Sequence, residues 1–197
     1  MARTPQRTLV LATRNPHKVR EVARLLAPGG FDVAPLPPDI VLPPEDGETF
    51  AENALPKAQA AARATGRESI ADDSGIEAAA LGGVPGVRSA RYAGPNATDE
   101  QNLAKLMAQA PAGSALRYVC TLAYVDPSSG TEQLFFGECR GRLADRPRGT
   151  RGFGYDPAFL PDDGPDGLTM SELSDEEKDA ISHRGHALRA LLRWLDS

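Results

Sequence analysis

The chain has 197 residues, of which 41% are hydrophobic and 25% are charged, and its formal net charge is −5 at pH 7. This composition is typical of a globular protein that forms one substantial domain, or one domain with a smaller lobe. An acidic chain does not attract polyanions as a whole, and no run of Lys and Arg interrupts this one. We therefore do not expect DNA or RNA polymers among its partners.

Neither the N-terminus nor the cysteines indicate export or a membrane segment. Residues 1–7 are basic, but the apolar stretch after them spans only residues 9–12, which is too short for a signal-peptide core or a membrane span. Cys120 and Cys139 lie in apolar, strand-like segments without metal-ligand spacing, so we expect buried, reduced thiols. The expected location is the cytoplasm, with residues 1–7 as an N-terminal extension.

The first third of the chain alternates strands and helices. Residues 8–12 predict a buried strand, the apolar spacing within 19–26 predicts a helix, and residues 31–36 predict a second strand. The alanine-rich segment 49–64 predicts another helix, in which Pro56 removes one backbone donor and can kink the helix. A strand, helix, strand opening is typical of α/β proteins.

The centre of the chain continues this pattern. Residues 69–71 predict a strand that ends in a turn at residues 72–75, because Asp, Ser and Gly favour turns. Thr98 is a suitable N-cap for a helix over residues 99–109.

The last third predicts a hairpin followed by helices. Residues 117–125 and 132–143 are rich in β-branched and aromatic residues and are separated by a Pro-Ser-Ser-Gly turn. Ser174 and Glu177 have the spacing of a capping box, and a leucine stripe within 188–195 predicts a terminal helix. The elements describe a single α/β unit of residues 1–197, with two lobes possible.

Four polar loops interrupt these apolar elements, and the first is residues 13–18 (TRNPHK) between the first strand and helix. Ligands of open α/β sheets bind beyond the carboxyl ends of strands, and helix N-termini offer free N–H groups to phosphate. Lys18 adds a positive charge for a terminal phosphate. The alternative is a capped helix start with a solvated lysine, and the pattern alone does not decide between them.

The second loop is acidic and contains Asp72 and Asp73, with Glu45 on an earlier loop. Mg²⁺ takes one or two protein carboxylates and leaves its other positions to water and phosphate oxygens. Adjacent carboxylates point in different directions, so only one is expected to face a metal, where it could also orient or deprotonate an attacking water. A simple Asx-type turn is the alternative.

The third loop is residues 152–157 (GFGYDP). Its glycines allow the backbone to approach a ligand closely, and Phe153 and Tyr155 could stack on a base. A tight turn with two core aromatic residues is the alternative.

The fourth loop contains Lys178 and, just before the last helix, Ser182, His183 and Arg184. Lys and Arg donate hydrogen bonds but cannot accept them, which favours a purine with a 6-keto group over the 6-amino group of adenine. A solvated basic helix start is the alternative. His183 and His186 could suggest a metal pair, but zinc is not expected because the chain has only three histidines.

Six motifs in order then resemble the inosine/xanthosine triphosphate pyrophosphatase family. No single motif is specific, but the ordered set extends from residue 8 to the C-terminus. The motifs are T-x-N-x-x-K (13–18), T-F-x-E-N-A-x-x-K-A (49–58), A-D-D-S-G (71–75), P-G-x-x-S-A-R-Y-A-G (85–94), G-F-G-Y-D-P (152–157) and S-H-R-G-x-A-L (182–188).

The resemblance implies a homodimeric α/β protein with an elongated mixed central sheet flanked by helices, and two lobes with a nucleotide cleft between them. It implies Mg²⁺-dependent hydrolysis of dITP, ITP, XTP or dXTP at the α-phosphorus to monophosphate and pyrophosphate, which keeps these bases out of DNA and RNA. Asp73 would be proton acceptor and metal ligand, and Glu45 the second metal ligand. Substrate would be bound by Thr13, Arg14, Asn15, Pro16, His17, Lys18, Ser74, Phe153, Gly154, Tyr155, Asp156, Lys178, His183 and Arg184.

Two departures and three rivals accompany this interpretation. Pro56 interrupts the helical motif and could shift Lys57, and Glu45 is aligned only by its two-residue distance from Gly47. The rivals are a pyrophosphatase for modified pyrimidine or methylated nucleotides, a nucleotide sensor without turnover, and a structural interaction protein. Intact Lys18 and Asp73 argue against the sensor, and the ordered motifs argue against the interaction protein.

Overall fold

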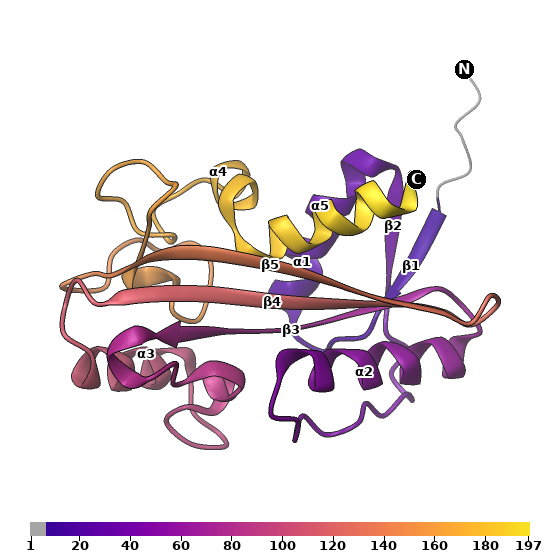
Figure 1. The fold of residues 1–197 in the computed structure, drawn as a ribbon, viewed down its shortest axis with the longest axis horizontal. Helices are drawn as coiled ribbons and strands as arrows, with labels where there is room; N and C mark the ends of the chain where they lie inside the picture. Colours follow the sequence, from indigo (N-terminus) through magenta and orange to yellow (C-terminus); the bar gives the residue numbers. More distant parts are fainter. Residues whose placement is uncertain (1–6) are drawn as a thin grey trace. The chain divides into compact units, whose positions relative to one another are not determined.

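The computed structural model describes residues 7–197 and contains a six-stranded sheet in the order β2-β1-β3-β4-β5-β6 (Figure 1). β1 pairs in parallel with both β2 and β3, whereas β5 pairs antiparallel with β6. The predicted α/β class with a mixed sheet and flanking helices is therefore confirmed. The strands are β1 (Arg7–Leu11), β2 (Phe31–Pro35), β3 (Ser69–Ala78), β4 (Ala115–Asp126), β5 (Thr131–Leu143) and β6 (Phe159–Pro161).

Five α-helices and four short 3-10 helices in residues 7–197 accompany these strands. The α-helices are α1 (Pro16–Leu26), α2 (Phe50–Thr65), α3 (Asp99–Gln109), α4 (Asp175–Ile181) and α5 (His183–Leu195). The 3-10 helices are η1 (Ala27–Gly29), η2 (Ala79–Leu81), η3 (Gly86–Arg91) and η4 (Asp156–Ala158). None of the helices in this described part is long and apolar enough to span a membrane.

The chain divides into two compact units. Unit 1 consists of Met1–Asp73, Thr121–Phe136 and Ala187–Ser197, and unit 2 consists of Ser74–Cys120 and Gly137–His186. The predicted N-terminal extension falls almost entirely outside the described residues. Its last residue, Arg7, begins β1 and pairs with Phe31 of β2. The nucleotide cleft that the resemblance implies stays a prediction.

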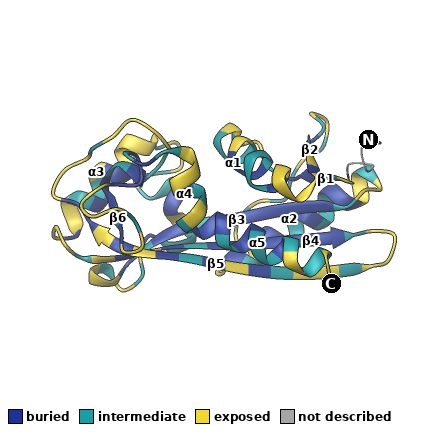
Figure 2. Cartoon of the chain, turned by 90° about the horizontal axis from the view of Figure 1, so that it is seen from above, coloured by how far each residue is buried: buried dark blue, intermediate teal, exposed yellow. Residues whose placement is uncertain are grey.

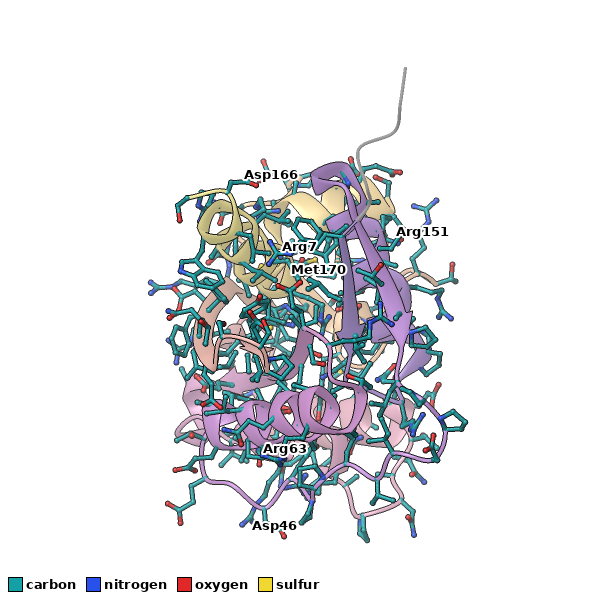
Figure 3. The ribbon with its side chains drawn as sticks, turned by 90° about the vertical axis from the view of Figure 1, so that its right-hand side faces the viewer. Arg7, Asp46, Arg63, Arg151, Asp166 and Met170 are labelled. Atoms are coloured by element: carbon teal, nitrogen blue, oxygen red, sulfur yellow. The ribbon has the colours of Figure 1, made fainter. Side chains whose placement is uncertain are left out.

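In unit 1, helices cover both faces of the strands (Figure 1). The alternation of β1 places Val10 on the face covered by α2, where four buried alanines of the helix pack closely against the strands. Arg63 lies on the exposed side of the same helix (Figure 3). On the other face, α1 and α5 cover the strands, and the Trp194 ring meets Tyr124 edge-on at a centroid distance of 5.3 Å.

Unit 2 has its own hydrophobic core, which is formed by the second half of β3, by α3 and by parts of β4, β5 and β6. Tyr118, Phe159 and Met170 are among its buried residues. Cys139 lies in this core and Cys120 is also buried, and neither of the two forms a disulfide, as predicted. Burial raises the pKa of Cys139 to about 12, so its thiol is not reactive at neutral pH.

Most predicted elements are confirmed within one or two residues, but the predicted turn at residues 72–75 is wrong. β3 runs through these residues without interruption and is buried along nearly its whole length (Figure 2). Its pairing with β1 covers only Ser69 and Ile70, but β4 lies on its other side in the sheet, and this long-range neighbour outweighs the local turn preference.

Pro56 does not end α2, which extends from Phe50 to Thr65. Proline removes the donor that would bond to the carbonyl four residues earlier, which belongs to Glu52. Glu52 is exposed, so this carbonyl can bond to water instead. The capping box of Thr49 and Glu52 also stabilises the start of the helix.

Candidate active site

The predicted site residues fall into two groups, one in each unit. Unit 1 contains residues 13–18, Glu45 and Asp73, and unit 2 contains Ser74, residues 153–156, Lys178, His183 and Arg184. We describe each group by itself.

The loop from Thr13 to Lys18 is shaped by its own side chains. Thr13 Oγ1 accepts a hydrogen bond from the Asn15 N–H at 3.2 Å, and Asn15 Oδ1 accepts from the N–H groups of His17 and Lys18 at 2.9 and 3.4 Å. Asn15 is thus the N-cap of α1, and Pro16 begins the helix. Because the cap occupies these amides, the Lys18 side chain is the group of this loop that offers positive charge to an anion.

Arg14 of the same loop binds the backbone of the proline-rich segment after β2. Its guanidinium donates to the carbonyl oxygens of Leu36 (2.9 Å), Pro37 (2.7 Å), Pro38 (3.2 Å) and Ile40 (2.8 Å). Prolines have no N–H, so this segment has more acceptors than donors. Arg14 therefore serves as a support of the loop that leads to Glu45.

Asp72 and Asp73 are adjacent in β3 and face opposite sides of the strand. Asp72 is 1% exposed, and its Oδ2 is 3.1 Å from Lys18 Nζ. Its carbonyl oxygen accepts from Lys57 Nζ at 2.9 Å. Lys57 Nζ is also 2.5 Å from Glu45 Oε1, so one ammonium connects the predicted metal-ligand loop to β3. The shift of Lys57 that Pro56 could cause does not prevent this contact.

Asp73 is held by Asn53, which the sequence analysis did not select. The Asn53 Nδ2 donates to Asp73 Oδ2 at 2.9 Å, and its Oδ1 accepts from the Gly47 N–H at 2.8 Å. A Cβ on Gly47 would lie 2.8 Å from Asn53 Oδ1, so glycine permits this approach. Asn53 is 2% exposed and therefore fixes both the Asp73 carboxylate and the end of the loop that carries Glu45.

Burial raises the pKa of Asp73 above its usual value, while Lys57, Lys18 and the Asn53 amide act in the opposite direction. A carboxylate that is buried among two lysines and an amide is suited to accept a proton or to bind a cation. We call Lys18, Lys57, Glu45, Asp72 and Asp73 the lysine–carboxylate cluster.

The donor set of this cluster fits Mg²⁺ better than a softer metal. Glu45 and Asp73 are hard oxygen ligands, and Mg²⁺ is usually bound by one or two carboxylates together with substrate phosphates. Within residues 7–197, no three His, Cys, Asp or Glu side chains gather into a ligand set that would hold an ion without a substrate. The phosphates would have to complete the coordination.

In unit 2, Asp156 is the centre of a second buried group. It is 3% exposed, and its Oδ2 is 2.6 Å from Lys178 Nζ and accepts from the Phe153 N–H at 2.9 Å. Its Oδ1 accepts from the Tyr118 hydroxyl at 3.0 Å. Gly152 has φ +73°, and a Cβ there would lie 2.1 Å from Asp156 Oδ2. The Gly-Phe-Gly segment is therefore folded around this carboxylate.

The aromatic residues of the 152–157 loop differ in their roles. Tyr155 is 6% exposed and belongs to the core of unit 2, and its hydroxyl donates to the Ser89 carbonyl oxygen at 2.8 Å. Phe153 is half-buried, and the centroid of its ring is 5.2 Å from Lys178 Nζ and 5.9 Å from Arg184 Cζ. Of the two rings, Phe153 is better placed to meet a planar ligand.

His183 and Arg184 lie in the first turn of α5, not before it as the sequence suggested. Arg184 is 1% exposed, and its Nη2 donates to Ser74 Oγ at 2.9 Å. The His183 ring stacks on Tyr118 with a centroid distance of 4.6 Å and an interplanar angle of 5°. We call Tyr118, Phe153, Asp156, Lys178, His183 and Arg184 the aspartate–lysine cluster.

The chain is thus an α/β protein with a lysine–carboxylate cluster in unit 1 and an aspartate–lysine cluster in unit 2. The chain belongs to the Ham1 family, which matches residues 9–194.

Relatives with this similarity cover nearly the whole chain. A dITP/XTP pyrophosphatase of Symbiobacterium thermophilum is 51% identical over 193 residues, covering 96% of this chain and 95% of that protein. A dITP/XTP pyrophosphatase of Deinococcus radiodurans is 48% identical over 189 residues, and the match covers 94% of this chain and 92% of that protein. Two solved structures are also similar to this chain. A HAM1 protein from Coxiella burnetii has a TM-score of 0.81 at 37% identity, covering 96% of this chain and 98% of that one. A nucleoside-triphosphatase, or dITP/XTP pyrophosphatase, from Mycobacterium abscessus has a TM-score of 0.72 at 42% identity, and the match covers 94% of this chain and 98% of that one.

Proposed function

We propose that this protein is a Mg²⁺-dependent pyrophosphatase that hydrolyses dITP, ITP, XTP and dXTP to the monophosphate and pyrophosphate. The observation that carries the proposal is the lysine–carboxylate cluster, in which Lys18 lies against the buried Asp72 carboxylate and Lys57 against the partly exposed Glu45 carboxylate. The names of the relatives support the substrate class, because they describe dITP/XTP pyrophosphatases at 45–51% identity.

The triphosphate would bind at the lysine–carboxylate cluster. Lys18 would exchange Asp72 for a phosphate oxygen, and Lys57 would exchange Glu45 in the same way. Each lysine would then stabilise negative charge as it moves onto the departing pyrophosphate. Glu45 and Asp73 would hold Mg²⁺, which supplies further charge neutralisation of the phosphates when bound. Asp73 would accept the proton of the water that attacks the α-phosphorus.

The purine would bind at the aspartate–lysine cluster. Lys178 and Arg184 carry only donors, so they would pair with the 6-keto oxygen of hypoxanthine or xanthine. Adenine presents an N–H donor at this position, which would leave the buried donors unpaired. Sites built in this way reject the wrong partner by about 10⁴-fold or more.

Two further parts of the proposal concern the assembly and location of the protein. We propose a homodimer in the cytoplasm, as the resemblance implies. Light scattering of the purified protein tests the dimer directly, and a monomer at micromolar concentration would contradict it.

The first experiment is pyrophosphate release from dITP, XTP, dGTP and dATP, with Mg²⁺ or with EDTA. The proposal expects metal-dependent release from dITP and XTP alone. Equal activity on all four would contradict the base selectivity, and turnover of only modified pyrimidine or methylated nucleotides would favour the pyrophosphatase rival. Tight ITP binding without any turnover would identify a sensor.

The second experiment assigns the proton acceptor. Asp73→Asn should lower kcat by at least ~100-fold, the lower end of a general-base contribution. Glu77→Gln is the matched control, because Glu77 lies in the same strand and pairs with Arg117 instead of a cluster residue. Near-normal turnover by Asp73→Asn would refute the assignment.

A further inference from the structure

Tyr118 lies in β4 and is a member of the aspartate–lysine cluster that no sequence motif contains. The burial of β4 alternates at this point, so Tyr118 faces the core of unit 2 and is 7% exposed. One side of its ring packs on Phe159 at a centroid distance of 4.6 Å and an interplanar angle of 44°. The ring is therefore fixed by the core.

The same side chain contacts two of the predicted substrate-binding residues. Its hydroxyl donates to Asp156 Oδ1 at 3.0 Å, and its ring stacks on the His183 imidazole at 4.6 Å and 5°. Asp156 begins η4 and His183 begins α5, so Tyr118 links two elements of unit 2.

Each contact restricts one degree of freedom. The parallel ring prevents the His183 imidazole from rotating about its last torsion, because the rotated edge would enter the tyrosine face. The hydroxyl occupies Asp156 Oδ1, while Lys178 and the Phe153 N–H occupy Oδ2. With donors on both oxygens, the carboxylate has one orientation and holds the Lys178 ammonium in one place.

The hydroxyl of Tyr118 remains a donor at neutral pH. Burial, followed by the negative charge of Asp156, raises the pKa of Tyr118 well above its usual value. Proton loss would place two negative charges side by side in the core.

We infer that Tyr118 is a positioning residue of the purine subsite, which sets the planes and donors of His183, Asp156 and Lys178 before the base arrives. This inference rests on the proposed function, because it assigns the aspartate–lysine cluster to the base. It predicts that Tyr118 controls base preference and substrate affinity, and that it leaves the phosphoryl step largely unchanged.

The test compares Tyr118→Phe, which keeps the stacked ring, with Tyr118→Leu, which removes it. For Tyr118→Phe we expect KM for dITP to rise about tenfold, in line with the loss of one hydrogen bond to a charged group, while kcat changes less than about twofold. The preference for dITP over dATP in kcat/KM should fall by about the same factor. Tyr118→Leu should lose more preference than Tyr118→Phe.

Tyr124→Phe is the matched control. Tyr124 lies in the same strand, and its hydroxyl donates to the Glu68 carboxylate at 2.6 Å. The same hydroxyl accepts a hydrogen bond from Arg7 at 3.4 Å. Neither Glu68 nor Arg7 is a predicted site residue. The control should keep the wild-type KM and base preference, and circular dichroism should show all variants folded.

Two results would overturn the inference while the proposed function stands. One is Tyr118→Phe with wild-type KM and preference. The other is a lower kcat at unchanged KM and preference, since this pattern reports only a smaller folded fraction. If the wild-type chain releases no pyrophosphate from dITP, the proposed function fails, and calorimetric ITP binding in EDTA decides the role of Tyr118. Weaker binding by Tyr118→Phe than by the wild type would support it, whereas equal binding by the two proteins, or no binding by the wild type, would overturn it.

Discussion

Replacing Lys178 by methionine should lower the free energy of unfolding by about 3 kcal/mol, because it leaves the Asp156 carboxylate buried without its cation. The two side chains are 7% and 4% exposed, and Nζ and Oδ2 are 2.6 Å apart. Removing one partner of such a pair costs about 3–5 kcal/mol. The lower value applies here, because Asp156 keeps the Tyr118 hydroxyl and the Phe153 N–H as donors.

Thermal and urea unfolding followed by circular dichroism measure this loss. For a chain of this length, about 3 kcal/mol corresponds to a decrease of about 6–12 °C in Tm. Lys105→Met is the matched control, since the Lys105 ammonium donates to the Tyr92 carbonyl oxygen and not to a carboxylate. It should cost only about 1 kcal/mol, the net value of an ordinary hydrogen bond.

A double-mutant cycle then isolates the buried charge. Adding Asp156→Asn to Lys178→Met removes the uncompensated carboxylate and should restore about 1–2 kcal/mol of the loss. A loss below about 1 kcal/mol for Lys178→Met would refute the reasoning. Simple additivity of the two substitutions would refute it as well, because it would mean that the two groups do not interact.

Three other substitutions test separate features of the structure. Gly152→Ala should destabilise the protein by clearly more than Gly154→Ala in urea unfolding. Both glycines have positive φ, but of the two only Gly152 would place its new Cβ within 4 Å of other atoms. Backbone strain at positive φ alone costs about 1–2 kcal/mol and is common to both. Equal losses of stability would therefore contradict this account. Asn53→Leu should lower the free energy of unfolding by about 2 kcal/mol, because one Asp73 carboxylate oxygen and the Gly47 N–H lose their partner. Unchanged stability in the same assay would show that water replaces the amide. Glu68→Gln should lower Tm at pH 7. The hydrogen bond from Arg7 lowers the pKa of Glu68 below its ordinary value, so the stabilisation is present above the unfolded-state pKa and is lost as the pH falls through the folded-state pKa. Melting curves of both proteins from pH 7 to 3 should converge on the acid side, and a constant difference would contradict the assignment.

The features that the sequence predicted correctly are those that local interactions decide. The N-caps at Thr98 and Ser174 are examples, because a cap needs only the side chain and the next three residues. The hairpin of β4 and β5 is another, since its turn and its strand residues are adjacent in the chain.

The features that the sequence did not predict depend on distant neighbours. Asp72 and Asp73 belong to a strand rather than a turn because β4, a segment more than forty residues later in the chain, lies beside β3 in the sheet. Asn53 belongs to the site because α2 places its amide against Asp73, twenty residues later in the chain. Tyr118 has the pattern of an ordinary core residue, and only the fold brings it to Asp156 and His183. The second family motif contains Asn53 but gives no sign of its role, and Tyr118 lies in none of the motifs.

The discontinuity of unit 1 has a consequence for synthesis of the chain on the ribosome. Unit 1 begins with Met1–Asp73 but also needs Ala187–Ser197, whereas every residue of unit 2 lies between Ser74 and His186. Chains emerge N-terminus first, so unit 2 can close its core while unit 1 still lacks the Trp194 ring that packs on Tyr124 and Phe135. The first segment made therefore belongs to the last unit completed.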